Sequence, residues 1–262
     1  MDPGVRTPLV DFFRRGEVAR DVRLVAAEGA FAPRALDQLA LLLILKDDAD
    51  PEIAGAAAHT IDRLPRPALE AFIGRTDVPG EMRQYFTALG LTPGGVVEDA
   101  EAPLIDTAES EPLPAPPTVD GAPEAIDVKA LSALGVMERM KLATRGTREQ
   151  RSVLVRDPNR LVAAAVLSSP KLTSSEVEAF AKMANVTEDV LRAIAMNRQW
   201  VKNYGVISGL TRNPKTPPAI SMQMVQRLNE KDLKMLTMDR NVPEAVRLAA
   251  RKFLRKGPKD MS

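Results

Sequence analysis

Few residue types that carry covalent or metal chemistry are present in this 262-residue sequence. It contains no cysteine and a single histidine, His59. Thiolate catalysis, disulfides and cysteine metal sites are therefore excluded, and sites that pair histidine with a nucleophile or with a second histidine have little to draw on. His59 lies off the apolar stripe of an expected helix, so we interpret it as a structural or surface residue.

Three aspartates between residues 47 and 50 resemble the start of a calcium-binding loop. Such a loop needs a glycine at its sixth position and a glutamate at its twelfth. Counted from Asp48, these positions are occupied by Ile53 and His59. Helix capping by Asp50 explains the cluster better than a metal site.

No other motif points to a reaction. Gly94-Gly95 has no strand before it and no Lys-Ser or Lys-Thr after it, so it is not a phosphate-binding loop. We find no serine-nucleophile motif and no paired carboxylates in a supporting context. The sequence therefore predicts no catalytic residue, no cofactor and no metal, and a protein that is not an enzyme.

Charge is distributed unevenly along the chain. Residues 1–126 contain 11 Lys and Arg against 22 Asp and Glu, whereas residues 127–262 contain 25 against 13. The overall charge of +1 conceals a net charge of −11 in the first part and +12 in the second. This asymmetry indicates either a polyanionic partner or association between the two parts. The alternative is that many of these charges only solvate helix surfaces.

The basic residues of the second part are the strongest candidate for a binding surface. In a helical repeat, equivalent turns align along one edge, and a positive stripe there would contact phosphates or an acidic segment. The predicted partner-binding residues are Arg145, Arg148, Arg151, Arg156, Arg160, Arg198, Lys202, Arg212, Lys215, Arg251 and Arg255. Basic residues in final helical turns would also interact favourably with the helix dipole.

Trp200 and Tyr204 lie among these charges and could stack on a base. With Ile207, however, they have the i, i+4, i+7 spacing of one buried helix face. Core packing is therefore the favoured interpretation.

Helices are the elements that must position these residues, since no stretch shows the alternation typical of strands. Residues 5–90 are predicted to form a series of helices. Asp50 is a predicted N-cap, with Pro51 at the first helical position.

Residues 91–126 differ in kind. They contain seven prolines and eight acids but no Lys or Arg. A segment of this composition cannot bury enough apolar surface to offset the entropy of ordering. We expect a disordered linker, reaching on the order of 30 Å, between a helical unit over 1–90 and a helical-repeat domain over 127–257, with a tail over 258–262.

A repeat of about 42 residues, with three helices in each copy, is predicted between 128 and 256. First helices are expected to start near Val128, Thr173 and Thr216, second helices near Thr147, Thr187 and Asn229, and third helices near Asn159, Arg198 and Asn241. Thr147 and Thr173 begin capping boxes, and Thr216 is a predicted N-cap followed by Pro217. Short helices are marginal alone, so stacking them predicts an all-α fold, an α-solenoid of three three-helix repeats.

Short sequences that recur at the helix ends support this assignment of the repeat boundaries. The second helices end in Leu154-x-x-Asp157, Ile194-x-x-Asn197 and Leu236-x-x-Asp239. Asp157-Pro158-Asn159 also mirrors Asp48-Ala49-Asp50, so the first part of the chain is expected to use a related turn.

The Asn or Asp turns, the proline starts and the three-helix period resemble α-solenoids of the HEAT and armadillo type. The Asn213-Pro214 turn is also similar to that of the leucine-rich-repeat-variant group. The resemblance covers roughly residues 128–256 and extends more weakly to 5–90. It implies a binding scaffold, and in a minority of such families a nucleic-acid-binding one. It carries no catalytic residues.

Asn185, Asn197, Asn213, Asn229 and Asn241 recur at predicted helix boundaries. A ladder of amides could bind an extended peptide backbone, as the armadillo resemblance suggests. Capping and turn formation at helix ends is the favoured interpretation.

These observations predict a non-enzymatic scaffold that binds an acidic segment of another protein through the basic surface of 128–256. The acidic linker, residues 98–126, is a candidate intramolecular ligand. The alternative is a nucleic-acid-binding module that uses the same surface. The third possibility is an enzyme, for which carboxylate catalysis remains open, or a regulatory ligand sensor. No stretch has the length or apolarity of a membrane span or a signal peptide, so we expect a cytoplasmic protein without membrane insertion.

Overall fold

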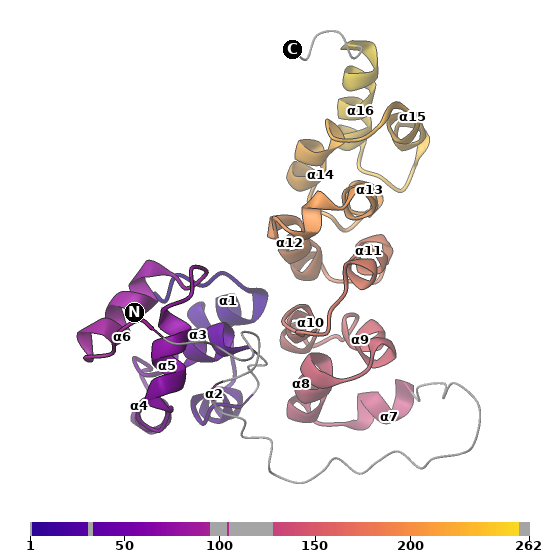
Figure 1. The fold of residues 1–262 in the computed structure, drawn as a ribbon. Helices are drawn as coiled ribbons and strands as arrows, with labels where there is room; N and C mark the ends of the chain where they lie inside the picture. The colour runs from indigo at the N-terminus through magenta and orange to yellow at the C-terminus, as the bar shows by residue number, and fades with distance from the viewer. Residues whose placement is uncertain (1, 31–33, 95–103, 105–127, 257–262) are drawn as a thin grey trace, which may run out of the picture. The chain divides into compact units, whose positions relative to one another are not determined.

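The computed structural model describes residues 2–30, 34–94, 104 and 128–256. All regular secondary structure in these ranges is helical, which confirms the predicted all-α class there (Figure 1). The predicted linker, apart from residues 91–94 and 104, lies outside the described residues.

The chain divides into two compact units. The first unit comprises residues 1–150 with 168–170, and the second comprises 151–167 with 171–262. The predicted binding residues from Arg151 onward belong to the second unit.

Helix α3 (Ala35–Leu45) is the centre of the first unit. Nine of its eleven residues are buried, on all sides of the helix. Helices α1 (Pro8–Arg14), α2 (Arg20–Ala27) and α4 (Pro51–Asp62) pack against it. The first unit also contains α5 (Arg66–Ile73), α6 (Gly80–Ala88), α7 (Val128–Ala133) and α8 (Val136–Arg145).

The predicted cap of α4 is confirmed. The Asp50 side chain accepts a hydrogen bond from the backbone N–H of Glu52 at 3.0 Å, and Pro51 begins the helix. Asp50 is itself held by Asp48, whose carboxylate accepts the backbone N–H of Asp50 at 2.9 Å.

The second unit is a run of short helices joined by brief connections. These are α9 (Arg148–Leu154), whose last residues belong to this unit, α10 (Arg160–Leu167), α11 (Ser174–Lys182), α12 (Glu188–Met196), the 3-10 helix Trp200–Lys202, α13 (Tyr204–Arg212), α14 (Pro218–Val225), α15 (Glu230–Met238) and α16 (Glu244–Lys256). Second neighbours along the chain pack together: α10 on α12, α11 on α13, and α14 on α16. Consecutive helices therefore alternate between two layers (Figure 1).

Helices α11 and α13 run parallel and approach closely. The backbone of Gly205 lies against the carboxylate of Glu178, and an ideal Cβ on Gly209 would lie 3.1 Å from the Cβ of Ala181. One turn further, the side chain of Asn213 donates to the carbonyl of Ala181. Because these contacts follow the same order along both helices, the two helices point the same way.

Helix α15 continues this arrangement. The backbone N–H of Asn229, just before α15, donates to the hydroxyl of Tyr204 at 3.1 Å, and Arg212 lies 3.7 Å from the sulfur of Met235. The start of α13 therefore faces the start of α15. Helices α11, α13 and α15 all begin at the same end of the second unit.

The helix boundaries match part of the prediction. Thr147, Thr173, Thr187 and Asn229 each directly precede a helix, as predicted. Both capping boxes are present: Thr147 exchanges hydrogen bonds with Gln150, and Thr173 does so with Glu176.

Other boundaries differ. Between 128 and 256 the structure has ten α-helices and one 3-10 helix, not the nine predicted. A single first helix is wrong, because extended backbone at Gly135 (φ −61°, ψ 159°) separates α7 from α8. Thr216 is not an N-cap: its N–H closes a turn onto the carbonyl of Asn213, which buries Thr216 and leaves Pro217 as the cap.

The prediction of one helix face through Trp200, Tyr204 and Ile207 is also wrong. Asn203 has extended backbone and ends the 3-10 helix before it caps α13. Ile207 is buried, Trp200 is half-buried, and Tyr204 keeps 40% of its surface exposed. The helix predicted to start near Arg198 is therefore divided into the 3-10 helix Trp200–Lys202 and α13, which starts at Tyr204.

The echoed turns share one geometry. In each, an Asp or Asn carboxylate or amide oxygen accepts the backbone N–H two residues later, a turn that side chains of these types favour. The pairs are Asp48 with Asp50 (2.9 Å), Asp157 with Asn159 (2.8 Å), Asn197 with Gln199 (2.9 Å) and Asp239 with Asn241 (3.0 Å). The related turn expected in the first part of the chain is therefore confirmed.

Candidate functional site

The residues first considered for chemistry serve structural roles. His59 is exposed on α4. Asp48 pairs with Arg23 at 2.5 Å, and Asp50 pairs with Arg20 at 2.7 Å. Across the described ranges, no group of three or more histidine, aspartate or glutamate side chains is placed to hold a metal ion.

Acidic side chains in the second unit are largely engaged by internal contacts. Its described residues include nine Asp and Glu against 19 Lys and Arg. Six of the acids form ion pairs: Glu176 with Arg151, Glu178 with Lys182, Glu188 with Arg192, Asp189 with Arg160, Glu230 with Lys234, and Asp232 with Arg212. The surface of this unit is therefore dominated by positive charge.

Arg151 is a buried residue of the predicted set. It pairs with Glu176 at 2.8 Å, with side chains only 5% and 3% exposed. Its guanidinium also donates to the carbonyl of Lys171 at 3.2 Å. Arg151 therefore fixes the start of α11 and is not available to a partner.

Two further predicted residues are held in ion pairs nearer the surface. Arg160, at the start of α10, pairs with Asp189 at 2.5 Å. Arg212 pairs with Asp232 at 2.5 Å, and the hydroxyl of Tyr204 donates to the same carboxylate. Burial, followed by this hydrogen bond, raises the pKa of the Tyr204 phenol above its ordinary value of 10.

The other predicted residues are exposed but not gathered along one line. Arg145 and Arg148 belong to the first unit. In the second unit the exposed members are Arg156, Arg198, Lys202, Lys215, Arg251 and Arg255. Lys202 precedes α13 and Lys215 follows it, so these two lie at opposite ends of a nine-residue helix.

Two of these exposed residues, Arg251 and Arg255, lie on one face of α16. Leu248, Arg251, Lys252 and Arg255 line an open groove of about 320 Å³. We call these four residues the α16 surface. Their spacing of three or four residues places them on one helix face. Val246 and Ala250 lie on the opposite, buried face, and Leu248 remains 52% exposed.

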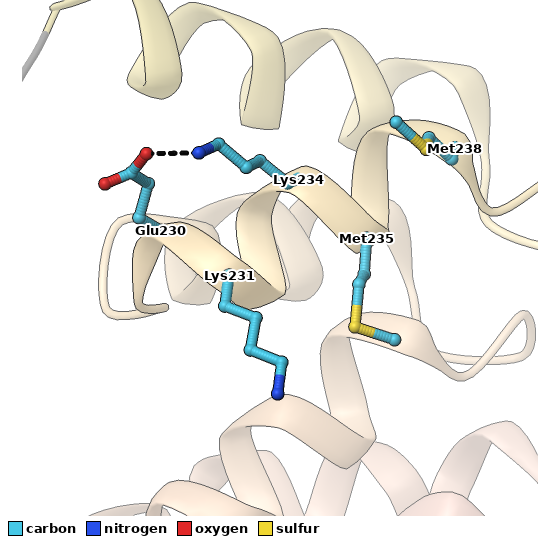
Figure 2. A pocket seen from close by; sticks show the side chains of 5 residues that line it. All are labelled: Glu230, Lys231, Lys234, Met235 and Met238. Carbon is cyan, nitrogen blue, oxygen red and sulfur yellow. Dashed lines mark ion pairs between the residues drawn. The ribbon is translucent and has the colours of Figure 1, made fainter.

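A second groove, of about 590 Å³, runs along α15. Its lining residues, which we call the α15 groove, are Glu230, Lys231, Lys234, Met235 and Met238. Lys231 and Met235 lie on one flank of the helix, and the Glu230–Lys234 ion pair lies on the other (Figure 2). The Lys234 ammonium holds the pKa of Glu230 below its ordinary value of 4.5, so this carboxylate stays charged and paired.

Exposed apolar side chains are the feature that residue-type reasoning missed. Met196, Met235 and Met238 are 71%, 50% and 78% exposed. The signal was present in α15, where Lys231, Met235 and Met238 recur at helical spacing beside the buried positions. Methionine adapts its shape to varied apolar partners.

The asparagine side chains act as caps and turn formers. Asn197 and Asn229 accept backbone N–H groups of the residues that follow them. Asn213 is 4% exposed and engages backbone groups of α11 and of its own turn. The capping and turn-forming interpretation is confirmed for these three residues. Both the nitrogen and the oxygen of the Asn213 amide are engaged, so this amide is not free to bind a peptide.

The chain matches no protein-family model, and no curated protein or solved structure is significantly similar to it. None of the helices in the described ranges has the length and apolarity needed to cross a membrane.

Proposed function

We propose that the second unit is a non-enzymatic helical-repeat scaffold that binds an acidic segment of another protein. The observation that carries the proposal is the α16 surface, where Leu248 is half exposed among Arg251, Lys252 and Arg255. Clustered positive charge attracts a polyanionic segment, and an exposed apolar side chain adds short-range contact area.

The charge balance of the unit supports an acidic partner. Arg251, Lys252 and Arg255 have no ion-pair partner among the described residues. The nearest acid in sequence on α16 is Glu244, at the first helical position, where it suits the helix dipole. The positive charge of α16 is therefore available to a ligand from outside.

The apolar component favours a protein over a nucleic acid at this site. Helix α15, which packs on α16, also exposes two apolar side chains, Met235 and Met238. Nucleic-acid interfaces are more polar and charged than this combination. A peptide with acidic residues flanking aliphatic ones matches both components.

The repeat character of the scaffold belongs to the same proposal. Packing of second-neighbour helices and recurrence of one turn geometry support a HEAT- or armadillo-like array.

Residues 98–126 supply a peptide of suitable chemistry, with eight acids, no Lys or Arg, and aliphatic residues such as Leu113. A labelled peptide of this sequence is titrated with full-length protein whose own eight acids in 98–126 are replaced by Asn or Gln. Fluorescence anisotropy is measured at about 50 mM salt, where the Debye length is roughly 14 Å, so that charge attraction is not fully screened.

We expect binding that weakens with salt and falls at least about tenfold in the double variant Arg251→Glu/Arg255→Glu. The matched control is Arg156→Glu/Lys215→Glu, which reverses two exposed charges elsewhere in the unit. Leu248→Ser should weaken binding without changing its salt dependence. Equal losses in the two double variants, or no binding at low salt, would disprove the assignment to α16.

A further inference from the structure

A second basic surface lies where α11, α13 and α15 begin. The segments of the second unit that precede these helices are residues 171–173, 197–203 and 226–229. Because the three helices are parallel, their preceding connections share one end of the second unit. Side-by-side helices are spaced by about 8–10 Å, so the three connections span roughly 20 Å.

This end carries positive charge without acids in the connections themselves. Lys171, Arg198, Lys202 and Arg227 are all exposed, and no Asp or Glu occurs in the three segments. We call these four residues, together with Trp200, the basic edge. At the opposite end of the unit, the connections after α9 and α15 contain aspartates.

Acids near the starts of the neighbouring helices are paired with cations. Glu178 pairs with Lys182 at 2.6 Å, and the Lys182 ammonium holds the pKa of this carboxyl below its ordinary value. Asp232 pairs with Arg212 at 2.5 Å. These carboxylates therefore offset little of the charge on the basic edge.

Backbone and side-chain hydrogen bonds hold the connections in place. The Asn197 side chain accepts the N–H groups of Gln199 and Trp200, at 2.9 and 3.3 Å. Arg227 donates to the carbonyl of Val201 at 2.7 Å, which ties the third connection to the second. A ligand would meet a surface that is already ordered, which reduces the entropy cost of binding.

Trp200, the only tryptophan of the chain, sits in the middle connection and is half-buried. Arg198 and Lys202 flank it at two residues on either side and are exposed. An indole with part of its surface open between two cations can stack on an unpaired base while the cations contact phosphates. A base inside a duplex offers no free face for such stacking.

We propose that the basic edge binds single-stranded nucleic acid without sequence preference. Its positive charges follow the phosphates across the three connections, and Trp200 stacks on one base. The site shares no residue with the α16 surface, so it does not depend on the proposed protein partner.

The lone tryptophan makes the test direct. Full-length protein is titrated with a 20-nucleotide oligothymidylate, and Trp200 fluorescence is followed through a salt series. We expect saturable quenching. Four phosphate contacts predict that log K falls with log salt with a slope of about −3, at roughly 0.7 per contact on a single strand.

The double variant Arg198→Gln/Lys202→Gln removes two exposed charges. Two lost contacts reduce the slope by about 1.4 and the affinity roughly 25-fold at 0.1 M salt. The matched control, Arg251→Gln/Arg255→Gln, should leave quenching unchanged. Trp200→Phe, followed by anisotropy of a labelled oligonucleotide, should keep the salt slope and weaken binding.

The proposal would be overturned by no quenching at about 50 mM salt, where such binding is strong, or by an unchanged slope in Arg198→Gln/Lys202→Gln. Equal quenching by poly-glutamate of matched charge would also overturn it and would assign the edge to acidic protein segments. Loss of oligonucleotide binding only in the α16 variant would instead assign nucleic acid to α16 and contradict both proposals.

Discussion

Asn213 allows a quantitative test of how the second unit is held together. Its side chain is 4% exposed. The amide nitrogen donates to the carbonyls of Ala181 and Met183, both at 2.9 Å, and the amide oxygen accepts the N–H of Lys215 at 3.0 Å. Both amide hydrogens are used on carbonyls at the end of α11, which have no partner within that helix.

Asn213→Ala removes all three hydrogen bonds, including the buried one to the carbonyl of Ala181. Each such bond contributes about 1 kcal/mol net, so the free energy of unfolding should fall by about 3 kcal/mol. For a chain of this size the melting temperature should drop by roughly 6–12 °C. Urea unfolding followed by Trp200 fluorescence reports on the same unit.

Two further variants separate the hydrogen bonds from other effects of substitution. Asn213→Asp keeps the acceptor for Lys215 but directs a carboxylate at two carbonyls, so it should be no more stable than Asn213→Ala. Asn241→Ala, at an exposed position, should change the free energy by no more than about 0.5 kcal/mol. A loss below about 1 kcal/mol in Asn213→Ala, or a stable Asn213→Asp protein, would refute the reasoning.

Three other substitutions test separate contacts. Gly209→Ala places a Cβ 3.1 Å from α11; overpacking should cost about 1–3 kcal/mol, whereas helix propensity alone predicts a gain, so the sign of the change in urea unfolding decides. Arg151→Met leaves the buried carboxylate of Glu176 without its ion-pair partner and should lower the free energy of unfolding by about 3–5 kcal/mol. Adding Glu176→Gln should restore part of this stability. No recovery in thermal melts would contradict a stabilising ion pair. Tyr204 has a raised pKa, so its contribution is complete below pH 10 and is lost as the pH rises through the folded pKa; Tyr204→Phe should remove this loss, and parallel pH–stability curves for the two proteins would argue against the contact with Asp232.

Local chemistry predicted much of the fold. The caps at Asp50, Thr147 and Thr173 were predictable because the partner lies two or three residues away in sequence. The repeated turns were predictable for the same reason. The all-α class followed from composition and helix signals, which do not depend on distant contacts.

Long-range contacts explain what the sequence could not specify. Arg151 resembles any exposed cation in the sequence, and its burial depends on Glu176, 25 residues later. Thr216 is a residue type that often caps helices, but its backbone N–H donates to the carbonyl of Asn213, and the resulting turn buries the residue. For the candidate site, the positive charge could be predicted from residue types. The ion pairs of Arg160 with Asp189 and of Arg212 with Asp232 could not, because the partners are distant in sequence. The predicted arginines therefore include some that are exposed and some that are held in ion pairs.

Asn213 also limits where this chain can be shortened. The residue lies after α13 yet completes α11, about thirty positions earlier. A deletion that begins at Asn213 would remove three helices and also damage one that it leaves in place. A cut after the turn, beyond residue 217, would spare that helix. Evolutionary insertion or deletion of whole helices should therefore begin or end at positions that keep each turn together with the helices before it.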